Sequence, residues 1–282
     1  MKIQKKILPF ILIMFLFFLL TFTIPVFTDT VTSKKPIKIT FIGNSGFIIE
    51  TGGKKIAIDA FFNGFPGRYT LPKNVIHKMK KSVGPFNNID LILSTHLHAD
   101  HLKVGYVSDY LVKNKETEFF ATDEAINIME KNHSEFNLYS NRAHGLNPGW
   151  GEIKNISFNG IEITAVGIPH GRNPVQHNCI IFRAGKKNFV HLGDMSGDKV
   201  QSVFKKADIK DMKFDIAFIP FWYLTNQKNA EIIKRNINSE QIIAMHLSLT
   251  DSNRDIPVFI KKILAFFPKA IIFQKELDFK NF

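Results

Sequence analysis

His96-Leu97-His98-Ala99-Asp100-His101 follows the apolar run Leu91-Ile92-Leu93 and places four metal-binding side chains within six residues. The apolar run predicts a short strand, and residues two apart in an extended segment point to the same side. His96 and His98 can therefore face one metal ion. As the chain leaves the strand, Asp100 and His101 can turn toward a second ion. The alternative is a solvated turn that is rich in histidine by chance. Four ligands directly after a buried strand favour a metal centre.

Three further ligand residues each follow a hydrophobic run that predicts a strand: His170, Asp194 and His246. Loops at strand ends are where a rigid sheet commonly holds functional side chains. Taken singly, each residue could equally be the polar end of a strand. Together with the early histidine cluster, they predict one shared site.

This order of ligands resembles the metallo-β-lactamase superfamily, and the resemblance covers most of the chain from about Ile37 onward. The superfamily pattern His-x-His-x-Asp-His, then His, Asp and His, is matched by His96, His98, Asp100, His101, His170, Asp194 and His246. The resemblance implies a first metal held by His96, His98 and His170. It implies a second metal held by Asp100, His101 and His246, with Asp194 bridging the two.

The flanking sequence is also similar to this superfamily. Residues 39–59 are similar to its opening hairpin, which ends in an aspartate below the site, here Asp59. Residues 178–182 are similar to the strand after the third histidine. The segments 215–220 and 244–246 most resemble the branch that includes ascorbate phosphate lactonase-like proteins and N-acyl-phosphatidylethanolamine phospholipase D.

Two positions depart from the pattern of relatives. Asn44 stands where many members of that branch have a histidine beside the site. The bridging position is Asp194, whereas a large group of true β-lactamases uses cysteine there. The only cysteine, Cys179, lies inside a predicted strand. An aspartate bridge therefore favours esters, lactones or phosphodiesters over β-lactams as substrates.

The coarse layout predicts an α/β fold, which the resemblance identifies as a four-layer αββα sandwich with two sheets face to face. Strands are predicted at 37–43, 46–51, 54–60, 90–94, 117–121, 152–158, 160–167, 178–184, 187–192, 214–219, 240–245 and 269–273. Helices are predicted at 72–82, 102–113, 123–131, 197–206, 226–236 and 254–266. Residues 132–151 are predicted to form a long loop. It could be a surface excursion, or it could cover the site, since long loops are often functional.

The N-terminal segment differs in character from the rest of the chain. Lys2, Lys5 and Lys6 precede an uncharged run at 7–27, whose length is near that needed to span a bilayer. We expect an uncleaved transmembrane anchor, with a cleaved signal segment as the alternative. The domain is then expected to be held outside the cytoplasm or secreted. The predicted organisation is an anchor or signal at 1–27, a linker at 28–36 and one hydrolase domain at 37–282.

The composition bounds the classes of partner. The chain has 37 Lys and Arg against 25 Asp and Glu, a net charge of +12. A positively charged domain can attract anionic membranes, phosphorylated substrates or nucleic acid. The sequence has no array of spaced basic and aromatic residues typical of a nucleic-acid groove. We therefore expect a small-molecule or lipid-like substrate. A single cysteine excludes an internal disulfide, so stability must come from packing and from metals.

Several other side chains are candidates for contact with a substrate or with the ligands. The segment 221–224, which includes Trp222, could line an apolar wall for an acyl group or pack beneath a helix. His191 is expected to hydrogen-bond near the site and not to bind metal. The remaining candidates are His144 and Trp150 in the long loop, and Arg172 and His177 beside His170.

These observations predict a hydrolase with two divalent ions, for which zinc is favoured and manganese or iron are alternatives. A hydroxide shared by the ions and oriented by Asp100 would attack an ester, lactone or phosphodiester. Two other functions stay open. One is a metal- or ligand-binding protein of the same fold without turnover. The other is a membrane-tethered nuclease outside the cytoplasm, which would bind nucleic acid with steep salt dependence.

Overall fold

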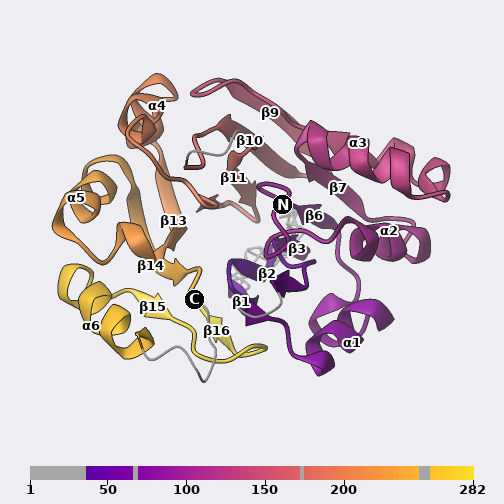
Figure 1. Ribbon diagram of the computed structural model, residues 1–282, viewed down its shortest axis with the longest axis horizontal. Helices are drawn as coiled ribbons and strands as arrows, with labels where there is room; N and C mark the ends of the chain where they lie inside the picture. Colours follow the sequence, from indigo (N-terminus) through magenta and orange to yellow (C-terminus); the bar gives the residue numbers. More distant parts are fainter. Residues whose placement is uncertain (1–35, 66–68, 172–174, 248–254) are drawn as a thin grey trace, which may run out of the picture. The chain divides into compact units, whose positions relative to one another are not determined.

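Two seven-stranded sheets lie face to face in this computed structural model, and helices cover the outer side of each (Figure 1). The structure describes residues 36–65, 69–171, 175–247 and 255–282. A separate two-stranded ribbon pairs β4 (Gly64–Phe65) with β5 (Tyr69–Thr70). Residues Lys35–Phe282 form one compact unit. The predicted α/β sandwich is therefore confirmed.

The first sheet has the strand order β16-β1-β2-β3-β6-β7-β8. Its first half is an antiparallel meander, whereas β3, β6, β7 and β8 run parallel. The strands are β1 (Lys38–Gly43), β2 (Gly46–Thr51), β3 (Lys54–Ile58), β6 (Leu91–Leu93), β7 (Glu118–Ala121), β8 (Ala143–Gly145) and β16 (Phe279–Asn281). The parallel strands end at one edge of this sheet.

The second sheet has the order β15-β14-β13-β12-β11-β10-β9. Here β9 to β12 are antiparallel neighbours, whereas β12 to β15 run parallel. The strands are β9 (Ile153–Phe158), β10 (Ile161–Gly167), β11 (Asn178–Ala184), β12 (Lys187–His191), β13 (Lys213–Pro220), β14 (Asn238–Met245) and β15 (Ile271–Ile272). Both sheets are thus mixed.

Alternating burial produces the four layers. Phe47 and Ile49 of β2 pack between the sheets, while Ile48 packs against the outer helices, because successive strand residues point to opposite faces. Strands buried on both faces need apolar runs without polar alternation. The first sheet is covered by α1 (Lys73–Lys81), α2 (Val104–Lys113) and α3 (Asp123–Asn132). The second is covered by α4 (Val200–Lys206), α5 (Gln227–Asn236) and α6 (Ile256–Phe266).

The predicted loop at 132–151 is more ordered than expected. It contains the short 3₁₀ turns η2 (Phe136–Leu138) and η3 (Ser140–Arg142), followed by β8. Arg142 is buried and donates to the carbonyls of Leu111, Asn114 and Thr117. Three main-chain partners hold this segment against the end of α2 and the connection from α2 to β7. The loop prediction failed here because these partners are distant in sequence. Shorter 3₁₀ turns are η1 (Gly84–Phe86), η4 (Ile209–Asp211) and η5 (Phe221–Tyr223).

The prediction of a membrane-anchored protein is corrected. Across the ranges that the structure describes, no helix is both long enough and apolar enough to cross a bilayer. The segment 1–27, on which the transmembrane anchor, the signal and the placement outside the cytoplasm all depended, lies outside those ranges. The domain boundaries at 27/28 and 36/37 stay predictions.

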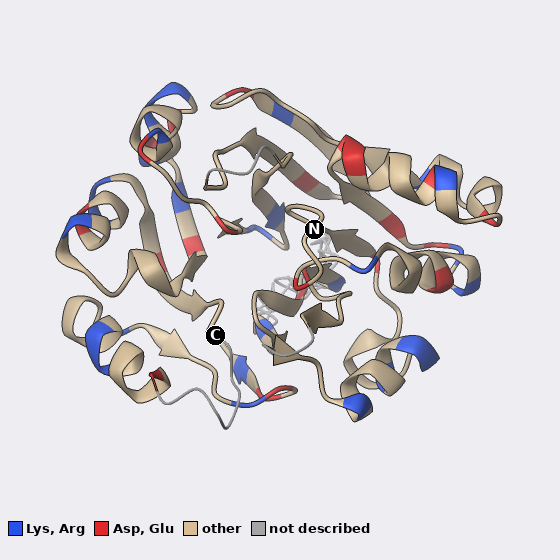
Figure 2. Ribbon diagram, viewed as in Figure 1, with Lys and Arg blue, Asp and Glu red and all other residues tan. Residues whose placement is uncertain are grey.

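Charged side chains concentrate on the outer layers. Figure 2 shows Lys and Arg on the covering helices and also on several of the strands. The strand residues of this kind, such as Lys38, Arg183 and Lys213, are exposed or half-buried. Helix α1 ends in Lys78, Lys80 and Lys81 and has no acidic residue in its first turn. The basic side chains are spread over helices, strands and loops, whereas the layer between the sheets is apolar.

Candidate metal centre

The seven predicted ligands meet at one edge of the sandwich. Residues 96–101 follow β6, whereas His170, Asp194 and His246 follow β10, β12 and β14 of the second sheet. These strands all end on the same side, so residues that are far apart in sequence converge there. The structure brings together every predicted ligand, in two groups that share Asp194. Their roles as metal ligands stay a prediction.

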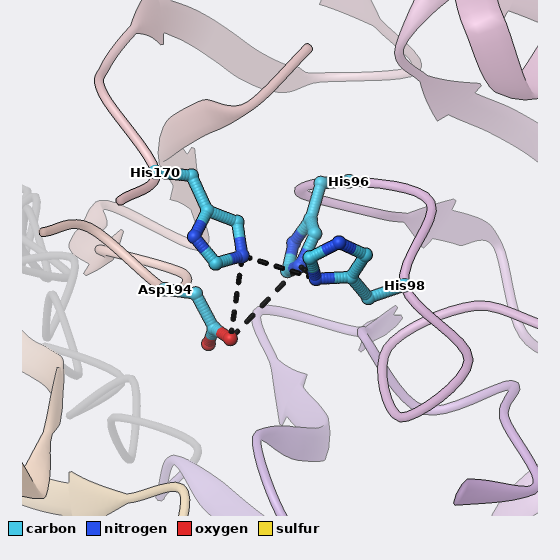
Figure 3. Close-up of side chains that lie close together, drawn as sticks. All are labelled: His96, His98, His170 and Asp194. Carbon is cyan, nitrogen blue, oxygen red and sulfur yellow. Dashed lines mark hydrogen bonds and ion pairs between the residues drawn. The ribbon is translucent and has the colours of Figure 1, made fainter. Parts of the chain in front are cut away.

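The first group consists of His96, His98, His170 and Asp194. Figure 3 shows the four side chains pointing toward one another, with His96 and His98 facing His170 and Asp194. His98 Nδ1 lies 3.0 Å from His96 Nε2 and 3.1 Å from His170 Nε2. Asp194 Oδ2 lies 4.0 Å from His96 Nε2 and 3.7 Å from His170 Nε2. Ligand atoms about 2.0 Å from a tetrahedral zinc are about 3.3 Å apart, which this spacing brackets.

The second group consists of Asp100, His101, Asp194 and His246. His246 Nε2 lies 3.2 Å from Asp100 Oδ2 and 3.1 Å from Asp194 Oδ2. His101 Nε2 lies 3.0 Å from Asp194 Oδ1. This group therefore has two carboxylates and two imidazoles, whereas the first has one carboxylate and three imidazoles.

Buried atoms of the second group test whether a metal fits. The Nε2 atoms of His101 and His246 and the Oδ1 atom of Asp194 form no hydrogen bond among the described residues, although they lie close together. A buried polar atom without a hydrogen bond is costly. Nitrogen and oxygen atoms left open toward one point are what a divalent ion needs from its ligands. The residues present thus fit metal binding.

Asp59, directly after β3, supports both groups from below. Its Oδ2 atom accepts from His101 Nδ1 at 2.7 Å and from the Thr95 hydroxyl at 2.7 Å. The Thr95 hydroxyl oxygen in turn lies 3.0 Å from His96 Nδ1. With Nδ1 of each imidazole engaged in this way, Nε2 is left to face a metal. Thr95 was not among the predicted site residues, since a threonine within a strand end carries no distinctive signal.

Asn44, the residue that departs from the branch pattern, contacts a ligand directly. Its Nδ2 donates to Asp100 Oδ2 at 3.1 Å and to the Asp100 carbonyl at 3.2 Å. The His246 N–H donates to the Asn44 carbonyl at 2.9 Å. Asn44, Asp59 and His246 all have left-handed backbone, with φ of 49°, 47° and 65°. Such conformations are costly for residues other than glycine and cluster at functional sites.

Two further histidines are buried beside the groups without belonging to either. His191 Nε2 donates to the Ser45 carbonyl at 2.9 Å, and its Nδ1 accepts from the Gly193 N–H. This agrees with the expectation that His191 hydrogen-bonds near the site. His177 Nε2 accepts from the Asp194 N–H at 2.9 Å. The sequence placed His177 near the site but predicted none of these contacts.

Protonation differs between the two groups. Burial lowers the pKa of His96 well below its usual value and lowers the pKa of His170 to about 4. Burial also disfavours charge on His246, but the Asp194 carboxylate outweighs it and raises the pKa of His246 to about 9. The carboxylates of Asp194 and Asp59 likewise raise the pKa of His101 well above its usual value against the effect of burial. Burial opposes ionisation of Asp194 as well, yet His101 and His246 hold its pKa well below the usual range.

The other candidate residues have varied surroundings. Trp222 packs edge-on against His246, with ring centres 5.0 Å apart, and its Nε1 donates to the Met195 carbonyl at 3.1 Å. His144 lies outside both groups, where its Nε2 is 2.5 Å from Glu118 Oε2 and its ring stacks on Phe120. Trp150 is exposed and lies beneath the Lys199 ammonium. Arg172 lies outside the described residues.

Comparison with known families gives one match over most of the chain. The family described as "Beta-lactamase superfamily domain" matches residues 38–246. A metal-dependent hydrolase of Pyrococcus furiosus is 42% identical over 66 residues, which are 23% of this chain and 24% of that protein. The chain thus matches about a quarter of the length of this relative. A metal-dependent hydrolase of Ligilactobacillus salivarius is 25% identical over 247 residues, covering 86% of this chain and 98% of that protein.

Solved structures share the fold at low sequence identity. The metallo-β-lactamase fold protein YhfI from Bacillus subtilis has a TM-score of 0.59 at 16% identity, covering 87% of this chain and 99% of that chain. CmlA from Streptomyces venezuelae, a diiron β-hydroxylase, has a TM-score of 0.57 at 13% identity, covering 89% of this chain and 54% of that one. At these identities the likeness concerns the fold, and one fold hosts several chemistries.

Proposed function

The chain belongs to the metallo-β-lactamase superfamily, and from this premise we propose that it is a metal-dependent hydrolase with two divalent ions in its centre. The observation that carries the proposal is the pair of ligand groups joined at Asp194, each with ligand atoms within 4.8 Å of one another. Because the carboxylate of Asp194 belongs to both groups, the two groups lie side by side. Support also comes from the open, buried ring nitrogens of His101 and His246.

When bound, two such ions would supply Lewis acidity and would lower the pKa of a water molecule in the centre. The side chains of this protein hold and orient the reacting groups. Asp59 and Thr95 fix the rings of His101 and His96. Asn44 fixes the carboxylate of Asp100. We assign Asp100 the task of orienting the attacking water, because Asn44 holds its Oδ2 within the second group, 3.2 Å from His246 Nε2.

Zinc is the metal that we propose for both groups. Imidazole and carboxylate ligands in a set of four suit zinc, and tetrahedral spacing fits the first group. Manganese and iron accept the same ligand types, and the second group is richer in carboxylate. Metal analysis of protein purified without added metal, followed by reconstitution with each ion separately, would distinguish them. Highest activity with an ion other than zinc would contradict this part of the proposal.

An ester, lactone or phosphodiester of a small or lipid-like molecule is the substrate class that we propose. Trp222 supports it, because its indole packs edge-on against His246. Phe221 packs on Trp222 and Phe259 packs on Phe221, so the aromatic surface continues to α6. An apolar substituent next to the scissile bond could bury itself along this surface.

The test is hydrolysis of a panel of carboxylic esters, lactones and phosphodiesters by the full chain loaded with zinc. We expect at least one class to be cleaved, with activity removed by a chelator and restored by zinc. His98→Ala should reduce this activity by about 10²- to 10³-fold, because one of the two polarising ions loses a ligand. It should leave the fold intact, because the ring of His98 is not part of the apolar core. The matched control is His77→Ala, which alters an exposed histidine on α1. Unchanged turnover in His98→Ala would contradict the proposal.

A further inference from the structure

A buried imidazole, that of His177, stands between two of the loops that carry the ligands. It is 4% exposed and belongs to neither ligand group. Its ring centre lies 5.0 Å from that of His96 and 5.2 Å from that of His170, both in edge-on contact. A buried polar ring at this place needs partners for both of its nitrogens.

The two nitrogens of His177 bind two different loops. Nδ1 donates to the Ile168 carbonyl at 3.2 Å, and the Ile168 N–H donates back to the His177 carbonyl at 3.0 Å. Nε2 accepts from the Asp194 N–H at 2.9 Å. A carbonyl can only accept and an N–H can only donate, so these partners assign the proton to Nδ1. One ring therefore joins the loop before His170 to the loop of Asp194.

A glycine leaves space for the His177 ring, and main-chain hydrogen bonds hold the segments on either side of it. Gly193 has a φ of +54°, and a Cβ there would lie 2.2 Å from His177 Nε2. The next residue, Asn178, donates its N–H to the Thr95 carbonyl at 3.0 Å, which ties the same segment to the first sheet. The Ser196 N–H donates to the Pro169 carbonyl at 3.0 Å and closes the same pair of loops from the other side.

We propose that His177 is a positioning residue that holds His170 and Asp194 in register for metal binding. The inference rests on the metal-binding part of the proposed function and not on hydrolysis. Its two contacts have separable effects. The contact with Ile168 concerns His170, and therefore the first group alone. The contact with the Asp194 N–H concerns a carboxylate common to both groups. The second group also has Asp59 and Asn44 to support it.

Two substitutions separate these contacts. In His177→Asn the side-chain amide nitrogen can replace Nδ1 and keep the bond to Ile168, but the acceptor for Asp194 is lost. In His177→Gln the side-chain oxygen can replace Nε2 and keep that acceptor, but the donor to Ile168 is lost. Losing a partner that orients a ligand typically weakens metal binding by about 10- to 100-fold. We expect His177→Gln to weaken only the first group and His177→Asn to weaken both.

The measurement is a cobalt titration of the metal-free full chain, followed by visible absorption and by metal content after dialysis. His144→Asn is the matched control, because it changes a histidine outside both groups. Circular dichroism checks the fold of each variant. If the native chain binds two ions and both variants match it in affinity for each, the inference is overturned. If the native chain binds no ion, the proposed function falls first and the inference with it.

A second measurement needs no variant. Long-range ¹H–¹⁵N spectra of the unaltered, metal-loaded chain report the tautomer of each histidine. We expect His177 to carry its proton on Nδ1, while Nε2 is unprotonated and accepts the hydrogen bond from the Asp194 N–H. A proton on Nε2 would contradict the bond from the Asp194 N–H and would overturn the proposal, even if both variants failed to fold.

Discussion

The two halves of the centre have different ligands and different charges. The first group has three imidazoles, and its described pKa shifts favour neutral rings. The second has two carboxylates, and these hold protons on His101 and His246 in the absence of metal. A metal entering the first group meets ligands ready to bind, whereas one entering the second must displace protons. On the proposed function, the two groups would therefore differ in how readily they bind a metal.

The largest effect is expected where the two halves meet. Asp194→Ala removes the one ligand that both groups contain, so both should lose their ions. Hydrolysis should fall by more than about 10³-fold, because several kcal/mol of Lewis-acid stabilisation disappears. Metal content per chain and kcat/KM measure the two effects. Retention of two ions by this variant would show that Asp194 does not join the groups.

Removing one ligand from each side should separate the halves. His98→Ala should leave one ion in the second group, and His246→Ala should leave one ion in the first. We expect each to reduce hydrolysis by about 10²- to 10³-fold, since one polarising ion is lost while the other stays. The cobalt absorption spectra of the two variants should differ, because one ion keeps three imidazoles and the other keeps two carboxylates. Identical spectra would mean that the two groups are not separate sites.

As the pH falls, metal binding to the second group should weaken before metal binding to the first group. His246 has a pKa raised to about 9, so below that pH a proton competes with the metal. Binding to the second group should therefore weaken by at least about tenfold for each unit of pH below 9, because His246 must release one proton and the protonated ring of His101 must release another. His170, with a pKa lowered to about 4, stays neutral until the pH falls close to that value, so it causes no such loss in the first group. Cobalt titrations at several pH values check this, and parallel losses in both groups would contradict it.

Substitution of Asp59, which hydrogen-bonds to His101, should have the smallest effect on metal binding. Asp59→Asn weakens the bond that orients His101 and reaches His96 only through Thr95. We expect the second group to lose about 10- to 100-fold in metal affinity and the first group to lose less. Asp215→Asn, at the far end of β13, serves as a control because its partners are Asn188 and Lys187. An equal loss of metal affinity in both groups would indicate that the indirect contact of Asp59 with His96 through Thr95 matters as much as its direct contact with His101.

Much of the fold could be predicted from the sequence because its strands are apolar and bounded by turns. The predicted strands at 46–51 and 178–184 match β2 and β11 in both bounds. Short edge elements were missed, namely β8 and β16, whose residues are few and partly exposed. Such elements form because a neighbouring strand supplies hydrogen-bond partners. That neighbour is distant in sequence, so the local residues do not predict the strand.

The ligand set was predictable for a related reason. Each candidate ligand lies in a segment that follows a strand, so a linear pattern records its position at the edge of a sheet. The residues that hold the ligands in place follow no such pattern. Thr95 and Asn44 are ordinary residue types, and each acts through a partner that lies elsewhere in the chain. His177 was noticed only because it is a histidine near His170.

What the sequence determined by itself is the set of candidate metal ligands and the alternation of apolar residues that places them after strands, since both are properties of neighbouring residues. Only the tertiary structure decided which candidate ligands lie together in one group, which rings are held neutral, and which main-chain groups meet His177. Those properties depend on distances of 3 to 4 Å between atoms of different strands. Such distances are set when the two sheets pack together, because burial and nearby charges act through space and not along the chain.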